Sequence, residues 1–433
     1  MKVVKSIFFL IFIASYSFAQ QNLSLRKAIE IGLQNNYSIR LAESDADITE
    51  QNRKAALSAL MPRIDANATY NKSIVDTRQV FVTGVIQERD AATTTQNLAG
   101  LQMSWVLFDG LKMFASYDRI KELEKMGEQN AKAAVQSVLA DIIINYYAIV
   151  ASQVQLKANA DALEVSKKRV EVLENKVKVG SSSTLDLLNA KVDYNSDYSN
   201  YLRQQENLKN LKIRLNELLI LPVNDDFTPS DSIPTNTLLN TDDLYNKLLI
   251  QNPLLINAKS QQRIAELNVK EVSADRYPTI RLNSGYNYSN VNAQAGFVIE
   301  NRTQGLSYGV TASVNIFNGL LQSRREKTAK IQSQAASMSY EVAKLTLETN
   351  WSLLLNNYKN NFELLRLERE NQLVAKRNID ISVEKYHLGG ISSLQLREAQ
   401  KAYIDANSRY VNALYQFKLA ETSLLELSSS IIP

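Results

Sequence analysis

The sequence predicts a mostly α-helical protein that also contributes strands to a membrane β-barrel, with the same plan present twice in the chain. Three observations predict this fold class. Landmark residues recur in order, for example Asn36 as Asn252 and Gly180 as Gly389; two very long stretches lack proline; and four short segments alternate apolar with polar residues. The repeated unit is too long for a solenoid, so each copy is expected to supply one strand hairpin and one long helical hairpin.

The N-terminus has the pattern of a secretory signal. Lys2 and Lys5 precede an apolar run at residues 7–13, and the small residues Ser17 and Ala19 mark a cleavage site. We therefore expect residues 1–19 to be removed and the mature protein to be exported. The apolar run is too short to span a membrane, and we expect no transmembrane helix later in the chain, so strands would do any spanning.

The composition of the 433 residues argues against several classes of function. The chain has no cysteine, a single histidine (His387) and a formal net charge of +4. Disulfides and thiolate or histidine-rich metal sites are thereby excluded, and the charge does not indicate nucleic acid as a partner. The sequence shows no nucleophile–base pair or phosphate-binding glycine loop, so it predicts neither an enzyme nor a bound cofactor or metal.

The first copy is expected to cover residues 20–221. Helical sequence from Leu25 to Leu60, interrupted at Asn35-Asn36, ends before Pro62. Strands are predicted at about 63–82 and 97–108 from their period-two alternation. The apolar positions of that alternation are Ile64, Ala66, Ala68 and Tyr70 in the first strand, and Leu101, Met103, Trp105 and Leu107 in the second. A helical hairpin is predicted at about 112–219, with its tip at 180–183.

A linker at 222–241, which contains three prolines, is expected to precede the second copy at 242–433. In that copy the predicted strands lie at about 279–297 and 304–317, and the helical hairpin lies at about 321–428 with its tip at 389–392. Each long helix would extend roughly 100 Å at about 1.5 Å per residue. Apolar residues spaced by seven predict coiled-coil packing on two sides, and charged runs such as Lys167-Lys168-Arg169 are expected on solvated faces.

Four strands cannot close a barrel, for which about eight are needed. A sheet with one apolar and one polar face also cannot leave its edges open in lipid. The sequence therefore predicts that several copies combine their strands in one closed barrel. Four aromatic residues are expected on its lipid-facing side: Tyr70, Trp105, Tyr286 and Tyr308. The number of copies does not follow from these residues.

The order of these elements resembles the TolC family of outer membrane efflux channels. The resemblance rests on the turns Phe108-Asp109-Gly110 and Phe317-Asn318-Gly319 and on two tip segments, Gly180 with Thr184 to Ala190 and Gly389 with Ser393 to Ala399. It covers essentially the whole mature chain. It implies a homotrimer with a twelve-stranded barrel in the outer membrane of a Gram-negative-type cell, continued by a helical periplasmic tunnel. It also implies docking to a periplasmic adaptor (membrane fusion) protein and an inner-membrane pump of the RND or ABC class.

The same resemblance suggests site residues. Family members line a periplasmic aperture with carboxylates shortly after the second tip glycine, and the matching positions here are Gln395 and Glu398. Asp186 and Asn189 are their equivalents in the first copy. Of Gln395 and Glu398, only Glu398 keeps the family's carboxylate, so an acidic ring would rest on Glu398 with help from Asp186. Acids near a helix start also have a purely structural use beside the helix dipole. The tips, at which the adaptor is expected to dock, contain Gly180, Ser181, Gly389, Gly390 and Ser392.

The predicted function is a passive exit duct of a tripartite efflux or type I secretion system. An exported coiled-coil adhesin or structural fibre is the alternative; it explains the heptads but gives the four strands no role. A porin acting alone would not need helices of roughly 100 Å. The sequence leaves open both the pump class and the cargo, which could be drugs, metal ions, siderophores or polypeptides.

Overall fold

The computed structural model describes residues 21–235 and 239–431. The predicted signal peptide, residues 1–19, and the last residue of the predicted second copy, Pro433, lie outside the described residues. The chain forms two compact units. The helical unit comprises the residues up to Arg40, Ala133–Asn252 and the residues from Glu348 onward, and the strand unit comprises Leu41–Lys132 and Pro253–Leu347. Both sequence copies contribute to both units, so neither copy is a compact unit by itself.

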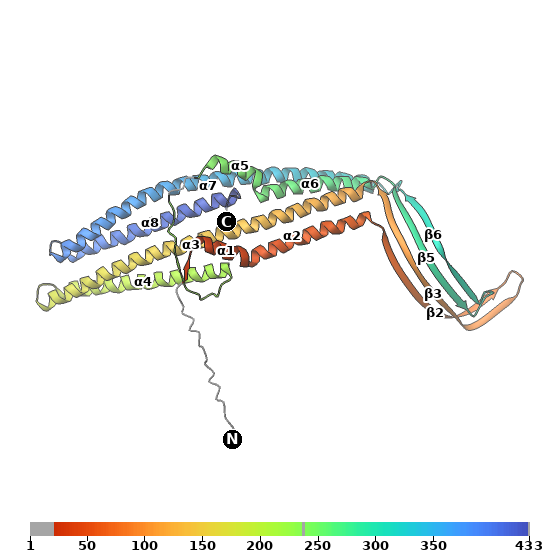
Figure 1. Cartoon of the computed structure of the whole chain (residues 1–433), viewed down its shortest axis with the longest axis horizontal. Coiled ribbons are helices and arrows are strands. Elements are labelled where there is room, and N and C mark those ends of the chain that lie inside the picture. The colour runs from red at the N-terminus through yellow and green to blue at the C-terminus, as the bar shows by residue number, and fades with distance from the viewer. Residues whose placement is uncertain (1–20, 236–238, 432–433) are drawn as a thin grey trace, which may run out of the picture. The chain divides into compact units, whose positions relative to one another are not determined.

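The helical unit contains two long helical hairpins (Figure 1). The first consists of α3 (Lys112–Lys178) and α4 (Thr184–Leu219), and the second of α7 (Leu321–His387) and α8 (Ser393–Leu427). The first parts of α3 and α7 belong to the strand unit. The remaining elements of the helical unit are α1 (Leu25–Asn35), α5 (Thr241–Gln251) and the parallel strand pair β1 (Gln21–Leu23) and β4 (Phe227–Pro229).

The predicted helix interruption at Asn35-Asn36 is confirmed, the second copy has an equivalent interruption at Asn252, and the same contact stabilises both. Asn36 follows α1 and donates from Nδ2 to the carbonyl of Leu218 at 2.9 Å. Asn252 follows α5 and donates from Nδ2 to the carbonyl of Leu427 at 2.8 Å. Each asparagine therefore satisfies a carbonyl at the C-terminal end of α4 or α8, where the helix has no internal donor left. In each copy, this contact joins the short helix to the returning helix of the same copy.

One helix among the described residues, α3, is apolar enough over a sufficient length to cross a membrane. This finding corrects the expectation that no such segment follows the signal. Packing accounts for part of the apolar character, because 44% of the apolar stretch is buried within the protein, and Leu139, Ile142, Tyr146 and Ile149 of α3 are fully buried. α1 packs so closely against α3 that a Cβ added to Gly32 of α1 would lie 2.2 Å from Ile142 Cδ1 of α3.

The strand unit carries one antiparallel sheet in the order β2-β3-β5-β6 (Figure 1). Its strands are β2 (Arg63–Val80), β3 (Ile86–Asp109), β5 (Thr279–Ala293) and β6 (Glu300–Ser313). The helical elements α2 (Tyr37–Ala56), η1 (Leu57–Leu60) and α6 (Pro253–Ala274) lead into β2 and β5.

Four predicted strand boundaries were wrong. β5 ends at Ala293 rather than near 297, and β6 begins at Glu300 rather than near 304. The other two are the start of β3 and the end of β6. β3 begins at Ile86 rather than near residue 97, because residues 86–96 lack apolar alternation but still pair with β2. β6 ends at Ser313 rather than near 317, because Ser313 pairs with Thr279, the first residue of β5, and the next residues have no strand opposite them. In both cases the length of the partner strand decided the boundary, and hydrophobic periodicity alone does not report that length.

The strand register gives the sheet one apolar and one polar face. Ala66, Leu101, Tyr286 and Leu306 lie opposite one another across the four strands on the apolar face. The neighbouring row, on the other face, is Asp65, Gln102, Gly285 and Ser307. Since a one-residue slip would mix the faces, the register preserves the predicted amphipathic alternation across both copies.

Candidate functional site

The two tips end their first helices in the same way. Gly180 and Gly389 adopt φ values of +75° and +73°, which a residue with a side chain rarely adopts. Ser181 N then donates to Lys176 O, and Gly390 N donates to Lys385 O, each at 2.8 Å. These bonds satisfy carbonyls at the helix ends, as in a Schellman motif. The prediction that both glycines end a long helix is confirmed.

The returning helices begin with serine caps that differ in one respect. Ser183 Oγ accepts from Asp186 N at 3.2 Å, and Ser392 Oγ accepts from Gln395 N at 3.2 Å. Only the second tip adds the reciprocal bond, in which Ser392 N donates to Gln395 Oε1 at 2.9 Å. Gln395 is therefore part of a capping box, which uses its side chain to stabilise the start of α8.

All four aperture candidates are exposed on the first two turns of α4 and α8. Ser182 Oγ donates to Asp186 Oδ2 at 3.4 Å, so this carboxylate also belongs to the local turn. Glu398 forms no ion pair with any residue that the structure describes, and Asn189 is likewise exposed. Of the four, Glu398 is the carboxylate whose local structure leaves it available to another group.

The four predicted lipid-facing aromatics lie on the apolar face of the sheet. Tyr70, Tyr286 and Tyr308 are 65%, 51% and 82% exposed in the single chain. Trp105 is half-buried, and its indole N–H donates to the carbonyl of Leu60 at 3.0 Å. This places Trp105 where η1 meets the sheet, with its polar group satisfied and its ring beside the apolar face.

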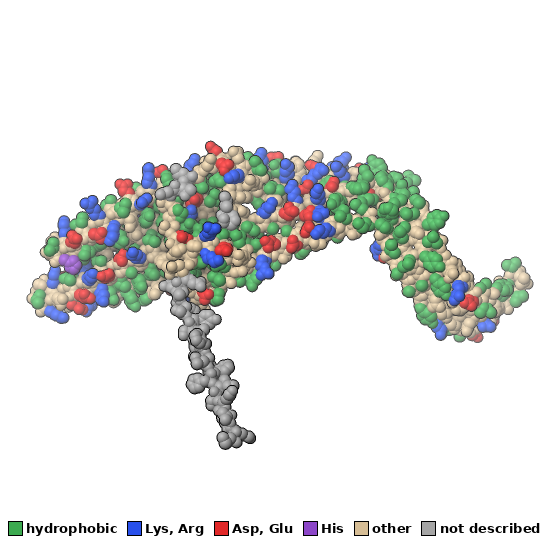
Figure 2. Space-filling model, viewed as in Figure 1, with side chains coloured by type: hydrophobic (Ala, Val, Ile, Leu, Met, Phe, Trp, Pro, Cys, Tyr) green, Lys and Arg blue, Asp and Glu red, His purple; other side chains and the backbone are tan. Residues whose placement is uncertain are grey.

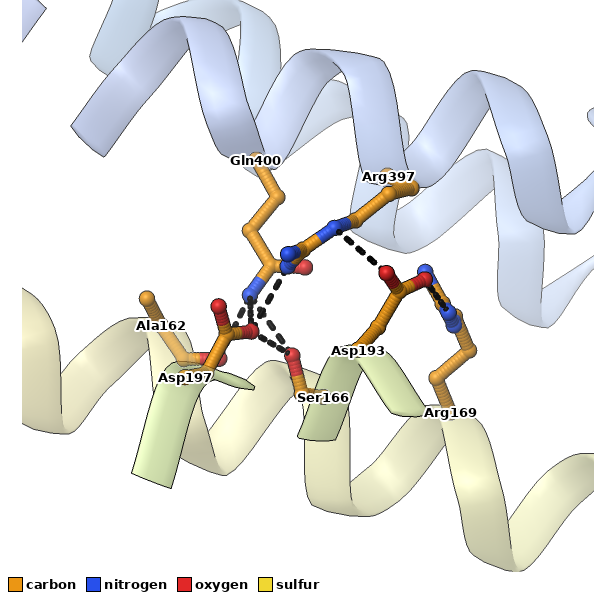
Figure 3. Close-up of polar contacts among 7 residues, drawn as sticks. All are labelled: Ala162, Ser166, Arg169, Asp193, Asp197, Arg397 and Gln400. Atoms are coloured by element: carbon orange, nitrogen blue, oxygen red, sulfur yellow. Dashed lines mark hydrogen bonds and ion pairs between the residues drawn. The ribbon is translucent and has the colours of Figure 1, made fainter. Parts of the chain in front are cut away.

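A buried polar cluster near the tips joins the two hairpins (Figure 3). We call it the inter-hairpin network and define it by Ser166, Arg169, Asp193, Asp197, Arg397 and Gln400. Asp197 of α4, with only 4% of its side chain exposed, accepts from Arg397 Nη1 of α8 at 2.6 Å. It also accepts from Gln400 Nε2 at 3.0 Å and from Ser166 Oγ of α3. One carboxylate thus connects three helices from both copies.

Two further contacts extend the network. Arg169 pairs with Asp193, whose other carboxylate oxygen lies 3.5 Å from Arg397 Nε. Gln400 Nε2 also donates to the carbonyl of Ala162 at 2.7 Å. Arg169 is only 3% exposed, so the prediction that it lies on a solvated face was wrong. Its Nη2 pairs with Asp193 on the facing helix, whereas its Nε and Nη1 are buried without a hydrogen-bond partner among the described residues.

The sequence predictions missed this network. Its members are polar residues on long helices, and heptad spacing does not identify which helix faces which. One signal was available: at the positions equivalent to Ser166 and Asp197, the second copy has Ala375 and Ala406. A polar residue replaced by alanine in the other copy indicates a buried contact that only one hairpin makes.

Two segments of the chain, residues 28–219 and 244–429, match the model of the outer membrane efflux protein family. The chain belongs to this family. The outer membrane protein TolC of Vibrio cholerae is 22% identical to it over 384 residues, covering 86% of this chain and 82% of that protein. This confirms the family predicted from the sequence and the outer membrane localisation.

Solved structures of outer membrane proteins share the fold of this family member. The CmeC outer membrane channel of Campylobacter jejuni superposes with a TM-score of 0.77 at 18% identity, covering 95% of this chain and 86% of that one. VceC of Vibrio cholerae gives a TM-score of 0.78 at 16% identity, covering 94% and 96%. The predicted fold class, helices combined with a membrane strand portion as in TolC-like channels, is confirmed. So is the prediction of an efflux protein of the outer membrane.

Proposed function

We propose that this chain forms a homotrimeric exit duct, in which three copies close one twelve-stranded barrel and continue it as a helical tunnel. The amphipathic sheet carries the proposal. In the described chain β2 and β6 are the outer strands of the sheet, each with a partner on one side only. Open edges are not tolerated in lipid, so β2 of one copy would pair with β6 of the next. The fibre alternative leaves this apolar face without a use.

The oligomer itself is the first test. We expect the protein purified in detergent to have the mass of three chains by native mass spectrometry, and to form ion-conducting pores in planar bilayers. A stable monomer that forms no pores would contradict the proposal. Each copy contributes two strand hairpins and two helical hairpins. Three copies would therefore form a wall with pseudo-sixfold symmetry.

The partners and roles of the tips are part of the same proposal. The duct would be passive, and a periplasmic adaptor and an inner-membrane RND or ABC pump would supply substrate and energy. The tips, with Gly180, Ser181, Gly389, Gly390 and Ser392, would contact the adaptor. The order of glycine turn and serine cap at both tips supports this, because it gives each hairpin a rigid, exposed end. The duct requires no catalytic residue and no cofactor.

Glu398 is proposed to line the periplasmic aperture. Three copies would place three carboxylates around one opening, and such a ring favours cations through its charge. We expect Glu398→Ala to reduce cation preference in single-channel recordings and to change the small resting conductance. Gln395 would contribute less, because the capping box holds its side chain.

Glu370→Ala is the matched control, because Glu370 is exposed on α7 away from the tip. This variant should conduct as the wild type does. Unchanged conductance and selectivity in Glu398→Ala would contradict the aperture assignment and leave the exit duct itself intact.

A further inference from the structure

The β2–β3 hairpin runs well past the end of β5 and β6 (Figure 1). β3 pairs with β5 only from Thr94 onward, whereas its residues from Ile86 to Ala92 pair with β2 alone. Residues 76–92 therefore form a two-stranded extension, which we call the outer ribbon. The β5–β6 loop, residues 294–299, lies along the ribbon, from the base, where Thr93 N donates to Gln294 Oε1, to the end, where Phe81 contacts Phe297.

The outer ribbon lies beyond the apolar belt of the sheet. On the apolar face, the row formed by Lys72, Thr95, Asn292 and Glu300 is polar throughout. Charged residues follow on the ribbon, where Arg78 and Glu88 form an ion pair at 2.6 Å. Since charged side chains mark the end of the hydrocarbon layer, the end of the ribbon would stand outside the membrane.

The end of the ribbon is nevertheless apolar. Figure 2 shows apolar side chains at the tip of this hairpin, beyond a charged band. We define the apolar tip as Phe81, Val82, Val85, Phe297, Val298 and Ile299. In the single chain Val82 is fully exposed and Phe297 is 82% exposed. Several large apolar side chains exposed together to water indicate an interaction surface.

The ribbon bends toward the polar face of the sheet. A bulge lies between Val75 and Thr77, where Ala91 adopts φ +52° and its N–H donates to Asp76 Oδ1 at 2.7 Å. Beyond the bulge, Phe81 contacts Phe297 with ring centroids 4.2 Å apart.

Gln79 gives the direction of the bend. It continues the polar face of β2, and its Oε1 would lie 3.9 Å from a Cβ placed on Gly296. The side of the ribbon that continues the polar face is thus the side that leans over the β5–β6 loop. In a closed barrel the polar face is the lumen face.

The ribbon is long enough to reach the axis of the proposed barrel. Twelve strands spaced about 4.8 Å apart and tilted about 40° give a circumference of about 75 Å, hence a radius of about 12 Å. From Thr77, just past the bulge, to Val82 the ribbon spans about 17 Å at about 3.3 Å per residue.

We propose that the apolar tips of three copies pack against one another on the channel axis and constrict the outer mouth. This inference rests on the homotrimer proposed above. Each apolar tip would pack against the apolar tips of the other two copies. Three features support the proposal. The ribbon continues β2, which is the strand at which a neighbouring copy would pair. It bends toward the lumen, and it is long enough to reach the channel axis. The duct would then have a constriction at the barrel mouth in addition to the aperture proposed above.

The absence of native cysteine allows a direct test. Val82→Cys is introduced as the single thiol, and detergent-solubilised trimers are oxidised with copper phenanthroline. We expect disulfide-linked pairs of chains that involve up to two of every three copies and that retain the mass of one trimer on native gels. A disulfide requires the two Cβ atoms to approach to about 4 Å, so such pairs form only if the tips converge.

Asn301→Cys is the matched control, because Asn301 is an exposed residue of β6 on the polar face, at the barrel wall. Copies of this residue would be roughly 20 Å apart in the same barrel, and we expect no disulfide. Trimers of Val82→Cys in which the introduced thiol reacts fully with maleimide but forms no disulfide would overturn the constriction and leave the homotrimer intact. Equal cross-linking at both positions would also overturn it. Absence of any trimer in the wild type would instead contradict the proposed function.

Discussion

In the first hairpin α3 and α4 contribute Ser166, Arg169 and Asp197 to a buried polar contact, whereas the equivalent residues of the second hairpin are Ala375, Asn378 and Ala406. The second hairpin instead packs an apolar cluster near its tip. Its members are Ile379, Tyr386, Leu396, Ala399 and Tyr403, with Val165 and Val172 of α3 packed against them. Two copies of one design have thus diverged in what they bury.

The difference makes the hairpins complementary. The second hairpin supplies Arg397 and Gln400 to the carboxylates of the first, where the equivalent first-copy residues are Leu188 and Lys191. A buried ion pair is weak evidence for net stability, because desolvation offsets much of the attraction. Its consequence is specificity: only one alignment of the two hairpins brings Arg397 onto Asp197.

The largest expected effect follows from removing the central carboxylate. Asp197→Ala would remove the acceptor of Arg397 Nη1 and of Ser166 Oγ, and one of the acceptors of Gln400 Nε2. Breaking a buried pair on one side costs about 3–5 kcal/mol, so we expect hydrogen exchange of α4 and α8 amides around the network to report a loss of about 3 kcal/mol. Glu206→Ala, an exposed position on α4, should stay within about 0.5 kcal/mol of the wild type.

A double variant shows whether the network acts as a unit. Arg397→Leu introduces the residue that the first copy has at the equivalent position, Leu188. Combined with Asp197→Ala, it removes both charges, so the double variant should be less destabilised than the sum of the two single variants by about 1–2 kcal/mol. Strictly additive losses would mean that the two hairpins do not recognise each other through this pair.

Local features of the fold could be predicted from the sequence, whereas the contacts between the two hairpins could not. Helices, strands and tips were predictable because proline, glycine and hydrophobic period act locally. Asp197 and Arg397 are 200 residues apart, and no local pattern indicates that α4 faces α8. For the same reason Arg169 was assigned to solvent. The aperture role of Gln395 is a prediction that rests on the resemblance alone, whereas its place in a capping box emerged from the geometry of the helix start.

A smaller loss of stability should distinguish the N-terminal caps of α4 and α8. Ser183→Ala and Ser392→Ala each remove a side-chain cap and should each cost about 1 kcal/mol in the first turn of α4 or α8. Gln395→Ala should cost about 0.5 kcal/mol, because only the reciprocal bond is lost. Hydrogen exchange at the first amides of α4 measures the Ser183 effect, and at the first amides of α8 it measures the Ser392 and Gln395 effects. If Gln395→Ala leaves these amides unchanged but alters channel conductance, Gln395 belongs to the aperture and the capping box is incidental.

The smallest expected effect concerns acid sensitivity of the first hairpin. Lys191 Nζ lies 2.9 Å from Glu174 Oε1 across α3 and α4, and its hydrogen bond holds the pKa of Glu174 below the ordinary value of 4.5. The second copy has Val383 and Gln400 at these positions, so it lacks this pair.

Because the folded hairpin binds the proton more weakly than the open one, the pair contributes stability above about pH 4.5 and loses it as the pH falls through the lowered pKa. Both side chains are largely exposed, so the effect is small and salt weakens it further. We expect Glu174→Gln to abolish this part of the acid-induced increase in hydrogen exchange around residue 174 and to leave α7 and α8 unchanged. An equal increase in the variant and the wild type would assign the acid sensitivity to other carboxylates and remove this difference between the hairpins.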